Sequence, residues 1–159
     1  MADHTPDLRF SRERPDSEEA RTLIRELDAD LLLRYPEQWI HGLHPEDIQD
    51  DELVFLVVRH GTELVGCGAL RPLEAGMAEI KRMFVRPPYR GRGISRKILG
   101  ALESIARERG YAVLRLETGT EQPEALALYR SSGYAGIPSY GEYLGNPYSI
   151  CFEKKLDLA

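Results

Sequence analysis

Cysteine is scarce in this chain of 159 residues, which contains only Cys67 and Cys151. The two are far apart in the sequence and show neither the spacing of a metal site nor a disulfide framework. The four histidines form no metal-spaced cluster either, so the sequence predicts no metal ion. No apolar run approaches the roughly 20 residues of a membrane span, and the polar first residues lack the apolar core of a signal peptide. We therefore expect a cytoplasmic protein that makes no contact with a membrane.

Positive charge is also in the minority, because 21 Lys and Arg residues stand against 26 Asp and Glu residues. A net charge of −5 argues against nucleic acid as the partner. Hydrophobic residues make up 42% of the chain, which is enough for the core of one globular domain of this length. No linker or internal repeat divides the sequence. We predict a single domain over residues 1–159, with residues 1–6 flexible.

Hydrophobic periodicity and turn residues predict alternating strands and helices. Apolar residues at helical spacing predict a helix from Ala20 to Leu31, capped by Asp16 or Ser17. A second amphipathic helix starts near Ile94 and ends at Gly110. Strands are expected at 7–13, 52–60, 63–73, 77–85, 111–118, 136–143 and 148–156, with further helices at 44–49 and 122–134. The strand after the Ile94 helix implies a parallel step, so the predicted fold is α/β, a mixed central sheet with helices on both faces.

The segment RPPYRGRGIS (86–95) lies between the predicted strand 77–85 and the helix that follows. A helix N-terminus exposes unbonded N–H groups and carries partial positive charge, and glycines before it let an anion approach closely. Seven basic residues and no acidic one occupy positions 81–97. This local positive patch in an acidic chain favours a site for a specific polyanionic ligand. A plain glycine-rich turn with a solvated basic face is the alternative.

Two well-known phosphate-binding motifs do not fit this segment. It lacks the Lys-Ser/Thr of a P-loop, which argues against a nucleoside triphosphate. It also lacks the third glycine of a dinucleotide-binding fold and follows an antiparallel hairpin.

The segment instead resembles the acyl-CoA-binding loop of the GCN5-related N-acetyltransferase (GNAT) superfamily, whose signature is Gln/Arg-x-x-Gly-x-Gly/Ala. RGRGIS (90–95) matches it except that Ser95 stands at the last small position. Downstream, QPEALALYRSSGY (122–134) resembles the family's Asn-x-x-Ala-x-x-x-Tyr-x-x-x-Gly-Phe helix. There Gln122 replaces Asn and Tyr134 replaces Phe, and the match includes Ala125, Tyr129 and Gly133. The C-terminal third is also similar to a bacterial subgroup of indole-acetate-related acetyltransferases, from which we carry over no substrate.

The resemblance implies the GNAT fold and an enzyme that transfers the acetyl group of acetyl-CoA to a primary amine by direct attack in a ternary complex. The acceptor is expected to be a small molecule. The alternatives are a CoA-binding or sensory module without turnover and a protein acetyltransferase acting on lysine or an N-terminus. By resemblance, the cofactor would be held by Met83, Phe84, Val85, Arg90, Gly91, Arg92, Gly93, Ile94, Ser95, Arg96 and Gln122. Side chains of Arg86, Arg90 and Arg92 are candidates for the remaining phosphate. Pairing through the C-terminal strands is a plausible route to a homodimer.

Tyr129 is the candidate general acid, because the family's tyrosine at this position protonates the departing thiolate. A core tyrosine on an amphipathic helix is the alternative reading. Glu79 is the candidate general base, and even spacing along the predicted strand places it on one face with Met83 and Val85. A surface glutamate in an ion pair is equally compatible with the sequence, and Glu117 is a second candidate base.

Aromatic and acidic residues are expected to wall the acceptor pocket, in the loops after the first helix and between the last strands. This composition suits a cationic amine with an apolar body, although packing or surface roles are equally compatible. The residues are Tyr35, Trp39, His41 and His44, followed by Tyr140, Glu142, Tyr143 and Tyr148.

Overall fold

A seven-stranded mixed sheet forms the centre of the computed structural model, which describes residues 7–157. Its strands lie in the order β1-β2-β3-β4-β5-β7-β6, and β4 and β5 pair in parallel while the other neighbours pair antiparallel. The expectation that residues 1–6 are flexible lies outside the described residues. The elements are β1 (Leu8–Arg12), α1 (Glu18–Leu32), η1 (Glu37–Trp39), α2 (Pro45–Gln49), β2 (Val54–His60), β3 (Glu63–Pro72), β4 (Met77–Val85), η2 (Pro87–Tyr89), α3 (Ile94–Glu108), β5 (Val113–Gly119), α4 (Pro123–Ser131), β6 (Ala135–Ile137), η3 (Gly141–Tyr143) and β7 (Ser149–Lys155).

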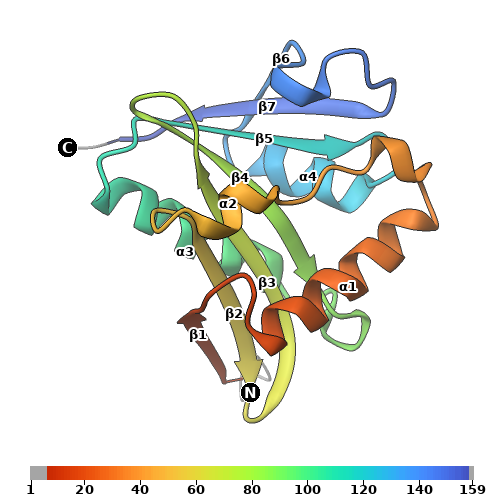
Figure 1. The fold of residues 1–159 in the computed structure, drawn as a ribbon, viewed down its shortest axis with the longest axis vertical. Coiled ribbons are helices and arrows are strands. Elements are labelled where there is room, and N and C mark those ends of the chain that lie inside the picture. Colours follow the sequence, from red (N-terminus) through yellow and green to blue (C-terminus); the bar gives the residue numbers. More distant parts are fainter. Residues whose placement is uncertain (1–6, 158–159) are drawn as a thin grey trace.

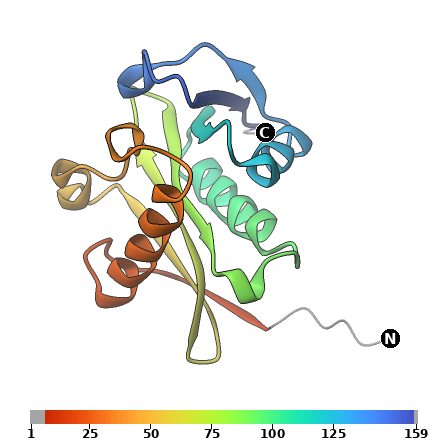
Figure 2. The same ribbon diagram turned by 90° about the vertical axis from the view of Figure 1, so that its right-hand side faces the viewer.

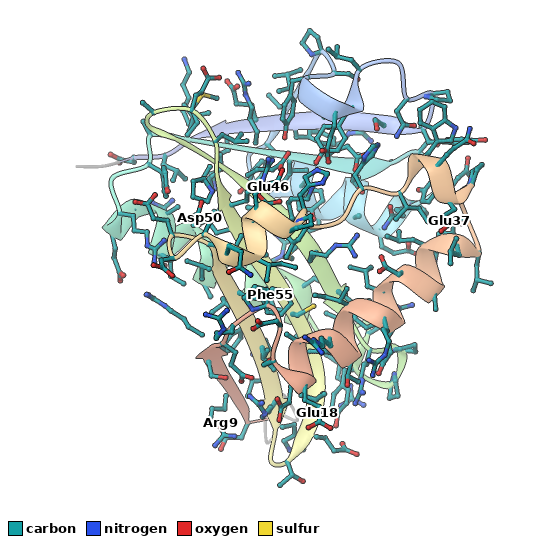
Figure 3. All side chains as sticks on the ribbon, viewed as in Figure 1. Arg9, Glu18, Glu37, Glu46, Asp50 and Phe55 are labelled. Carbon is teal, nitrogen blue, oxygen red and sulfur yellow. The ribbon has the colours of Figure 1, made fainter. Side chains whose placement is uncertain are left out.

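Helices cover both faces of the sheet, with α1 and α2 on one face and α3 and α4 on the other (Figures 1 and 2). Each face has its own apolar core. On the α1 face, Leu23 and Phe55 are buried in one cluster, and Figure 3 shows Phe55 between the sheet and the helices in front of it. On the α3 face, Ile98 and Leu102 belong to a larger cluster. The predicted fold class, a mixed sheet with helices on both faces, is confirmed.

The helix boundaries follow the sequence signals. Ser17 caps α1, because its Oγ accepts a hydrogen bond from the backbone N–H of Ala20 at 3.1 Å. Gly110 follows α3 with a φ of 79°, the left-handed conformation that glycine adopts without steric cost.

The segment after α4 differs from the prediction of a long strand at 136–143. Its strand, β6, covers only Ala135–Ile137, and the 3-10 helix η3 follows. The chain turns inward here because Tyr140 and Tyr143 both direct their hydroxyls to the buried carboxylate of Glu79. Strand β6 lies at the edge of the sheet, and pairing of two copies there stays a prediction.

A β-bulge interrupts β4 at Arg82, which has a φ of 57°. Lys81 is paired with Ala69 and Phe84 with Cys67, so two residues of β4 oppose one residue of β3. The bulge reverses the alternation of side chains. Glu79 therefore lies on the α1 face, whereas Met83 and Val85 pack against the α3-side core. The prediction that these three residues share one face is wrong, because even spacing holds only for an uninterrupted strand.

Over residues 7–157, no helix has the length and apolar character that a bilayer crossing requires. Nor does this part of the chain bring three or more His, Cys, Asp or Glu side chains together in a group that could hold a metal ion.

Candidate active site

Strands β4 and β5 separate partway along their length, and a cavity of about 720 Å³ opens at that point. Their pairing ends at Ile80 and Leu116, although β4 continues to Val85 and β5 to Gly119. Both strand ends line the cavity, together with residues of the 89–96 loop, α4 and the segment that follows α1. An unpaired strand edge offers backbone N–H and C=O groups to an extended ligand, as in strand addition. Met83, Phe84 and Val85 stand at this edge, as predicted for residues that hold the cofactor arm.

The glycine-rich loop ends as an open cradle at the N-terminus of α3. Gly91 and Gly93 have φ values of 79° and 74°, and a Cβ atom at either position would have no neighbour within 4 Å. Gly93 is the N-cap residue, and no side chain caps the helix or places an acid in its first turn. The first N–H groups of α3 are thus left for an external partner. Ile94, Ser95 and Arg96 line the cavity with the two glycines, so the cradle fits a phosphate group.

The arginines of the loop serve different purposes. Arg90 lines the cavity, and its Nε donates to the carbonyl of Val85 at 2.8 Å. Arg96 also lines the cavity, and its guanidinium donates to Ser131 and Ser132 at the C-terminal end of α4. Arg92 is exposed and stacks over the ring of Tyr89, outside the set of lining residues.

Arg86, a further candidate for a phosphate contact, is held by α1 instead. Its guanidinium donates to both carboxylate oxygens of Glu26, at 2.8 and 2.6 Å, and to the carbonyl of Leu64. These contacts fix the end of β4 against α1. Of the arginines between positions 86 and 96, Arg90 and Arg96 line the cavity.

Tyr129 lies on α4 with its side chain buried at the cavity wall. Burial, together with the nearby charge of Glu117, raises the pKa of its hydroxyl, so the group stays protonated at neutral pH. Gln122 lines the same cavity at the start of α4. Its Oε1 accepts hydrogen bonds from the N–H of Gly119 and the hydroxyl of Tyr35, which ties α4 to the end of β5.

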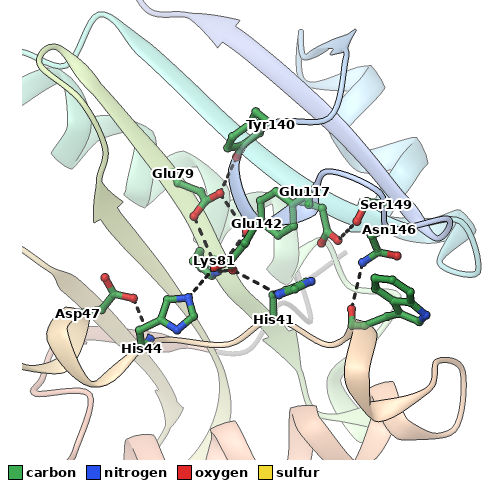
Figure 4. Close-up of polar contacts among 12 residues, drawn as sticks. His41, His44, Asp47, Glu79, Lys81, Glu117, Tyr140, Glu142, Asn146 and Ser149 are labelled. Carbon is green, nitrogen blue, oxygen red and sulfur yellow. Dashed lines mark hydrogen bonds and ion pairs between the residues drawn. The ribbon is translucent and has the colours of Figure 1, made fainter.

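Glu79, the candidate base, is 1% exposed and is absent from the cavity lining. Its carboxylate is surrounded by donors (Figure 4). Arg71 donates to Oε1 at 3.1 Å, and Tyr140 and Tyr143 donate to Oε2 at 2.5 and 3.0 Å. Lys81 Nζ stands 3.8 Å from Oε1. A carboxylate with this many partners, placed behind the cavity wall, is suited to organising the site and poorly suited to taking a proton from a substrate.

Glu117, the second candidate base, does line the cavity, at the open end of β5. Burial raises the pKa of its carboxyl group, and the hydrogen bond from Ser149 Oγ at 2.6 Å only partly opposes this. A carboxylate whose proton affinity is increased by desolvation is a better base near neutral pH than an exposed one. The structure thus places Glu117, and not Glu79, beside Tyr129 in the lining.

Two loops close the other end of the cavity. The segment between α1 and α2 supplies Tyr35, Trp39 and His41, and the segment between β6 and β7 supplies Tyr143, Asn146 and Tyr148. The loops are joined to each other, because Asn146 Nδ2 donates to the carbonyl of Trp39 and the ring of Tyr35 meets that of Tyr148 edge-on. Five of the eight residues predicted for the pocket wall therefore line the cavity from both loops, whereas the other three, His44, Tyr140 and Glu142, lie outside the lining.

A charged network beneath these loops centres on Glu142 (Figure 4). Its Oε2 lies 2.5 Å from His44 Nε2, and its Oε1 lies 3.3 Å from Lys81 Nζ and 3.5 Å from His41 Nδ1. Burial works against the charge, but the contacts with His44 and Lys81 hold the pKa of Glu142 below its ordinary value. Glu142 is consequently a carboxylate at neutral pH.

Sequence reasoning missed Asn146 as a member of the site, and it counted Lys81 and Arg82 only within the basic patch at positions 81–97, although both are buried and paired with acidic residues. Lys81 and Arg82 are each less than 10% exposed, and Arg82 donates to Asp28 on α1 and to the carbonyl of His41. The signal for Lys81 and Arg82 was the run EIKR within an otherwise apolar strand, because charged residues are seldom buried without partners.

Comparison with known proteins agrees with this geometry. A family model described as "Acetyltransferase (GNAT) family" matches residues 24–134. A protein of Azospirillum brasilense named "IAA acetyltransferase" is 40% identical over 152 residues, which cover 95% of this chain and 99% of that protein. A Bacillus subtilis protein named "Uncharacterized N-acetyltransferase YsnE" is 33% identical over 137 residues, which cover 85% of this chain and 91% of that protein.

Solved structures share the fold. One from Klebsiella pneumoniae, assigned as an acyl-CoA N-acyltransferase, superposes with a TM-score of 0.80 at 35% identity and covers 95% of this chain and 99% of that one. A GNAT family acetyltransferase from Elizabethkingia anophelis, solved with acetyl-CoA bound, has a TM-score of 0.71 at 17% identity, covering 94% of this chain and 99% of that one.

Proposed function

Since this chain belongs to the GNAT family and is an N-acetyltransferase, we propose that it transfers the acetyl group of acetyl-CoA to a primary amine on a small molecule. The main support for this proposal is that four features line the same cavity. They are an open phosphate cradle, an unpaired strand edge, the protonated hydroxyl of Tyr129 and the desolvated carboxylate of Glu117. These are the groups that direct transfer within a ternary complex needs.

The cofactor end of the cavity fits acetyl-CoA, which supplies an activated acetyl thioester when bound. Backbone N–H groups from Gly91 to Arg96 would hold the pyrophosphate, and Arg90 and Arg96 border the same space. The open edge from Met83 to Val85 would pair with the pantetheine arm, and an N–H there would polarise the thioester carbonyl. The structural neighbour of the same fold with acetyl-CoA bound is consistent with this assignment.

Tyr129 is proposed as the general acid. Breaking the carbon–sulfur bond leaves a thiolate, which takes the proton of the Tyr129 hydroxyl. No hydrogen bond joins that hydroxyl to another residue among those that the structure describes, so its proton is free to be donated into the cavity.

Glu117 is proposed as the general base in place of Glu79, because it lines the cavity and has the raised pKa that the role requires. It takes one proton from the ammonium form of the acceptor, and the neutral amine then attacks the thioester carbonyl carbon. The acceptor is proposed to be small because the aromatic loops between α1 and α2 and between β6 and β7 close this end of the pocket.

Two matched tyrosine variants test the proposal. Tyr129 and Tyr134 are both buried at the end of α4 and contact each other edge-on, but Tyr134 donates to Glu103 at 2.8 Å. Tyr129→Phe should lower kcat by about 10²-fold or more and leave stability unchanged. Tyr134→Phe should instead lower stability, by about 1 kcal/mol, and keep kcat.

The assay is CoA release across a panel of primary amines, with acetyl-CoA binding followed by calorimetry. Binding of acetyl-CoA without acetylation of any amine would point to a binding module, and acetylation of lysine peptides alone would point to a protein acetyltransferase. Equal kcat for Tyr129→Phe and the wild type would remove Tyr129 from the mechanism.

A further inference from the structure

His41 carries a buried nitrogen that nothing in the described structure satisfies. Its Nε2 is inaccessible to solvent and has no hydrogen-bond partner, although the residue lines the cavity. Buried polar atoms are nearly always paired, so an orphan at a cavity wall points to a partner that arrives with the ligand. In Figure 4 the imidazole lies between Glu142 and the part of the view that contains Glu117 and Asn146.

We propose that His41 Nε2 binds the acceptor nitrogen and takes the second of the two protons that this nitrogen loses, while Glu142 orients the imidazole. The inference rests on the proposed function and adds a substrate-contacting residue to it.

The tautomer of His41 follows from its neighbours. Nδ1 faces Glu142 Oε1 at 3.5 Å, and an ionised carboxylate can only accept a hydrogen bond. Nδ1 therefore carries the hydrogen of the neutral ring, and Nε2 keeps a lone pair that no hydrogen bond uses, in a residue that lines the cavity. Edge-on packing against the ring of Tyr143, at 5.3 Å between centroids, fixes the plane of the imidazole.

Burial keeps the ring of His41 neutral, and the surrounding charges act in both directions. Glu142 of η3 and Glu79 of β4 favour the imidazolium, whereas Lys81 of β4 and His44 before α2 oppose it. Burial is the largest influence, and it lowers the pKa of His41 below its ordinary value. A neutral imidazole at physiological pH is ready to accept a proton.

The proton balance explains why a second base is useful. An ammonium acceptor gives one proton to Glu117, and its lone pair then forms the bond to the thioester carbon. The nitrogen is now cationic and still carries two hydrogens, one of which leaves as the carbon–sulfur bond breaks. His41 Nε2 takes that proton, and Tyr129 gives its own to the thiolate. The products are the acetamide, CoA and one proton. Of the two protons then held by Glu117 and His41, one restores the hydroxyl of Tyr129 and the other passes to solvent.

Two substitutions at His41 separate contact from proton transfer. His41→Gln keeps a hydrogen-bond acceptor but no basic nitrogen, so the acceptor KM should stay within about threefold and kcat should fall roughly 10²-fold. His41→Leu removes both properties, so KM should rise at least tenfold as kcat falls. His60→Gln, at the exposed end of β2, is the matched control and should behave as the wild type.

The kinetics use the panel amine that the wild type acetylates fastest, and calorimetry with acetyl-CoA accompanies each variant. Unchanged acetyl-CoA affinity with the stated KM and kcat pattern supports the proposal. Wild-type kinetics in His41→Leu would overturn it. If the wild type acetylates no amine, the proposed function has failed. In that case, nitrogen NMR of the protein labelled with ¹⁵N-histidine still determines which ring nitrogen of His41 carries the hydrogen. The spectrum of His41→Gln assigns the His41 signals. A hydrogen on Nε2 at pH 7 would refute the proposal that Glu142 orients the imidazole with its hydrogen on Nδ1. An Nε2 without a hydrogen would support it.

Discussion

The glycines at the two ends of α3 provide a controlled test of the phosphate cradle. Gly93 precedes the helix with a φ of 74° and Gly110 follows it with a φ of 79°. A Cβ atom would meet nothing within 4 Å at either position. Replacement by glutamate therefore imposes similar left-handed strain at both ends, but only Gly93 belongs to the proposed site.

The strain should be modest. A non-glycine residue in the left-handed region costs about 1–2 kcal/mol, which corresponds to a fall in Tm of roughly 2–8 °C for a chain of this size. The helix dipole favours a carboxylate at position 93 and disfavours one at 110. Gly110→Glu should therefore be at least as destabilised as Gly93→Glu.

The effect on acetyl-CoA binding should differ strongly between Gly93→Glu and Gly110→Glu. One carboxylate and two phosphate charges at an assumed separation of about 5 Å repel by about 1.7 kcal/mol even at the dielectric constant of water. This is roughly a twentyfold loss of acetyl-CoA affinity, and the lower effective dielectric at a protein surface increases it several-fold in energy. The glutamate side chain also occupies the space in front of the free N–H groups.

Calorimetric titration of acetyl-CoA into the wild type and both variants measures this difference, and thermal unfolding without ligand checks the strain. We expect binding lost in Gly93→Glu and retained in Gly110→Glu. Equal affinity in all three proteins would show that the loop is a basic surface turn, and the cofactor assignment would lose its main support.

Two paired predictions concern two glutamates, Glu79 and Glu117, and two glycines, Gly66 of β3 and Gly100 of α3. Glu79→Gln should lower the free energy of unfolding by about 3 kcal/mol, measured in urea, because a buried ion pair is broken. Glu117→Gln should instead lower kcat/KM. Because the folded-state pKa of Glu117 is raised, this carboxyl favours the folded state below its unfolded pKa, and the advantage is lost as pH rises through the folded value. Glu117→Gln should therefore gain stability relative to the wild type as pH rises over that window. Gly66→Ala would place a Cβ 2.3 Å from the carbonyl oxygen of Phe84 and should cost at least 2 kcal/mol, whereas Gly100→Ala, in open space within α3, should add about 0.5–1 kcal/mol, both read from thermal unfolding.

Local signals were enough to predict most elements of the fold. The helix α3 follows from apolar residues at 3.6-residue spacing, and its ends follow from Gly93 and Gly110. The cradle was predictable for the same reason, because the residues that build it are contiguous in the sequence. Backbone N–H groups at a helix start need no long-range partner to be in place.

Features that depend on long-range contacts were not predictable from these patterns. The strand expected at 136–143 ends early because Tyr140 and Tyr143 bind Glu79, about 60 residues upstream. The burial of Glu79 itself depends on donors from three separate segments of the chain. The sequence offered Glu79 and Glu117 as bases, and only the separation of β4 from β5 distinguishes them, because it exposes one carboxylate to the cavity.

The bulge at Arg82 connects the two halves of the proposed site. A non-glycine residue at a φ of 57° costs about 1–3 kcal/mol, so the surrounding contacts must hold it. Those contacts are the guanidinium bonds to Asp28 on α1 and to the carbonyl of His41. The residue that breaks the regular alternation of β4 therefore also supports the loop that carries His41, the proposed acceptor-binding residue. On one side of the bulge, Glu79 and Lys81 lie beside the proposed acceptor pocket, and on the other, Met83 and Val85 form the proposed edge for the cofactor arm. A regular strand would place both sets on one face of the sheet.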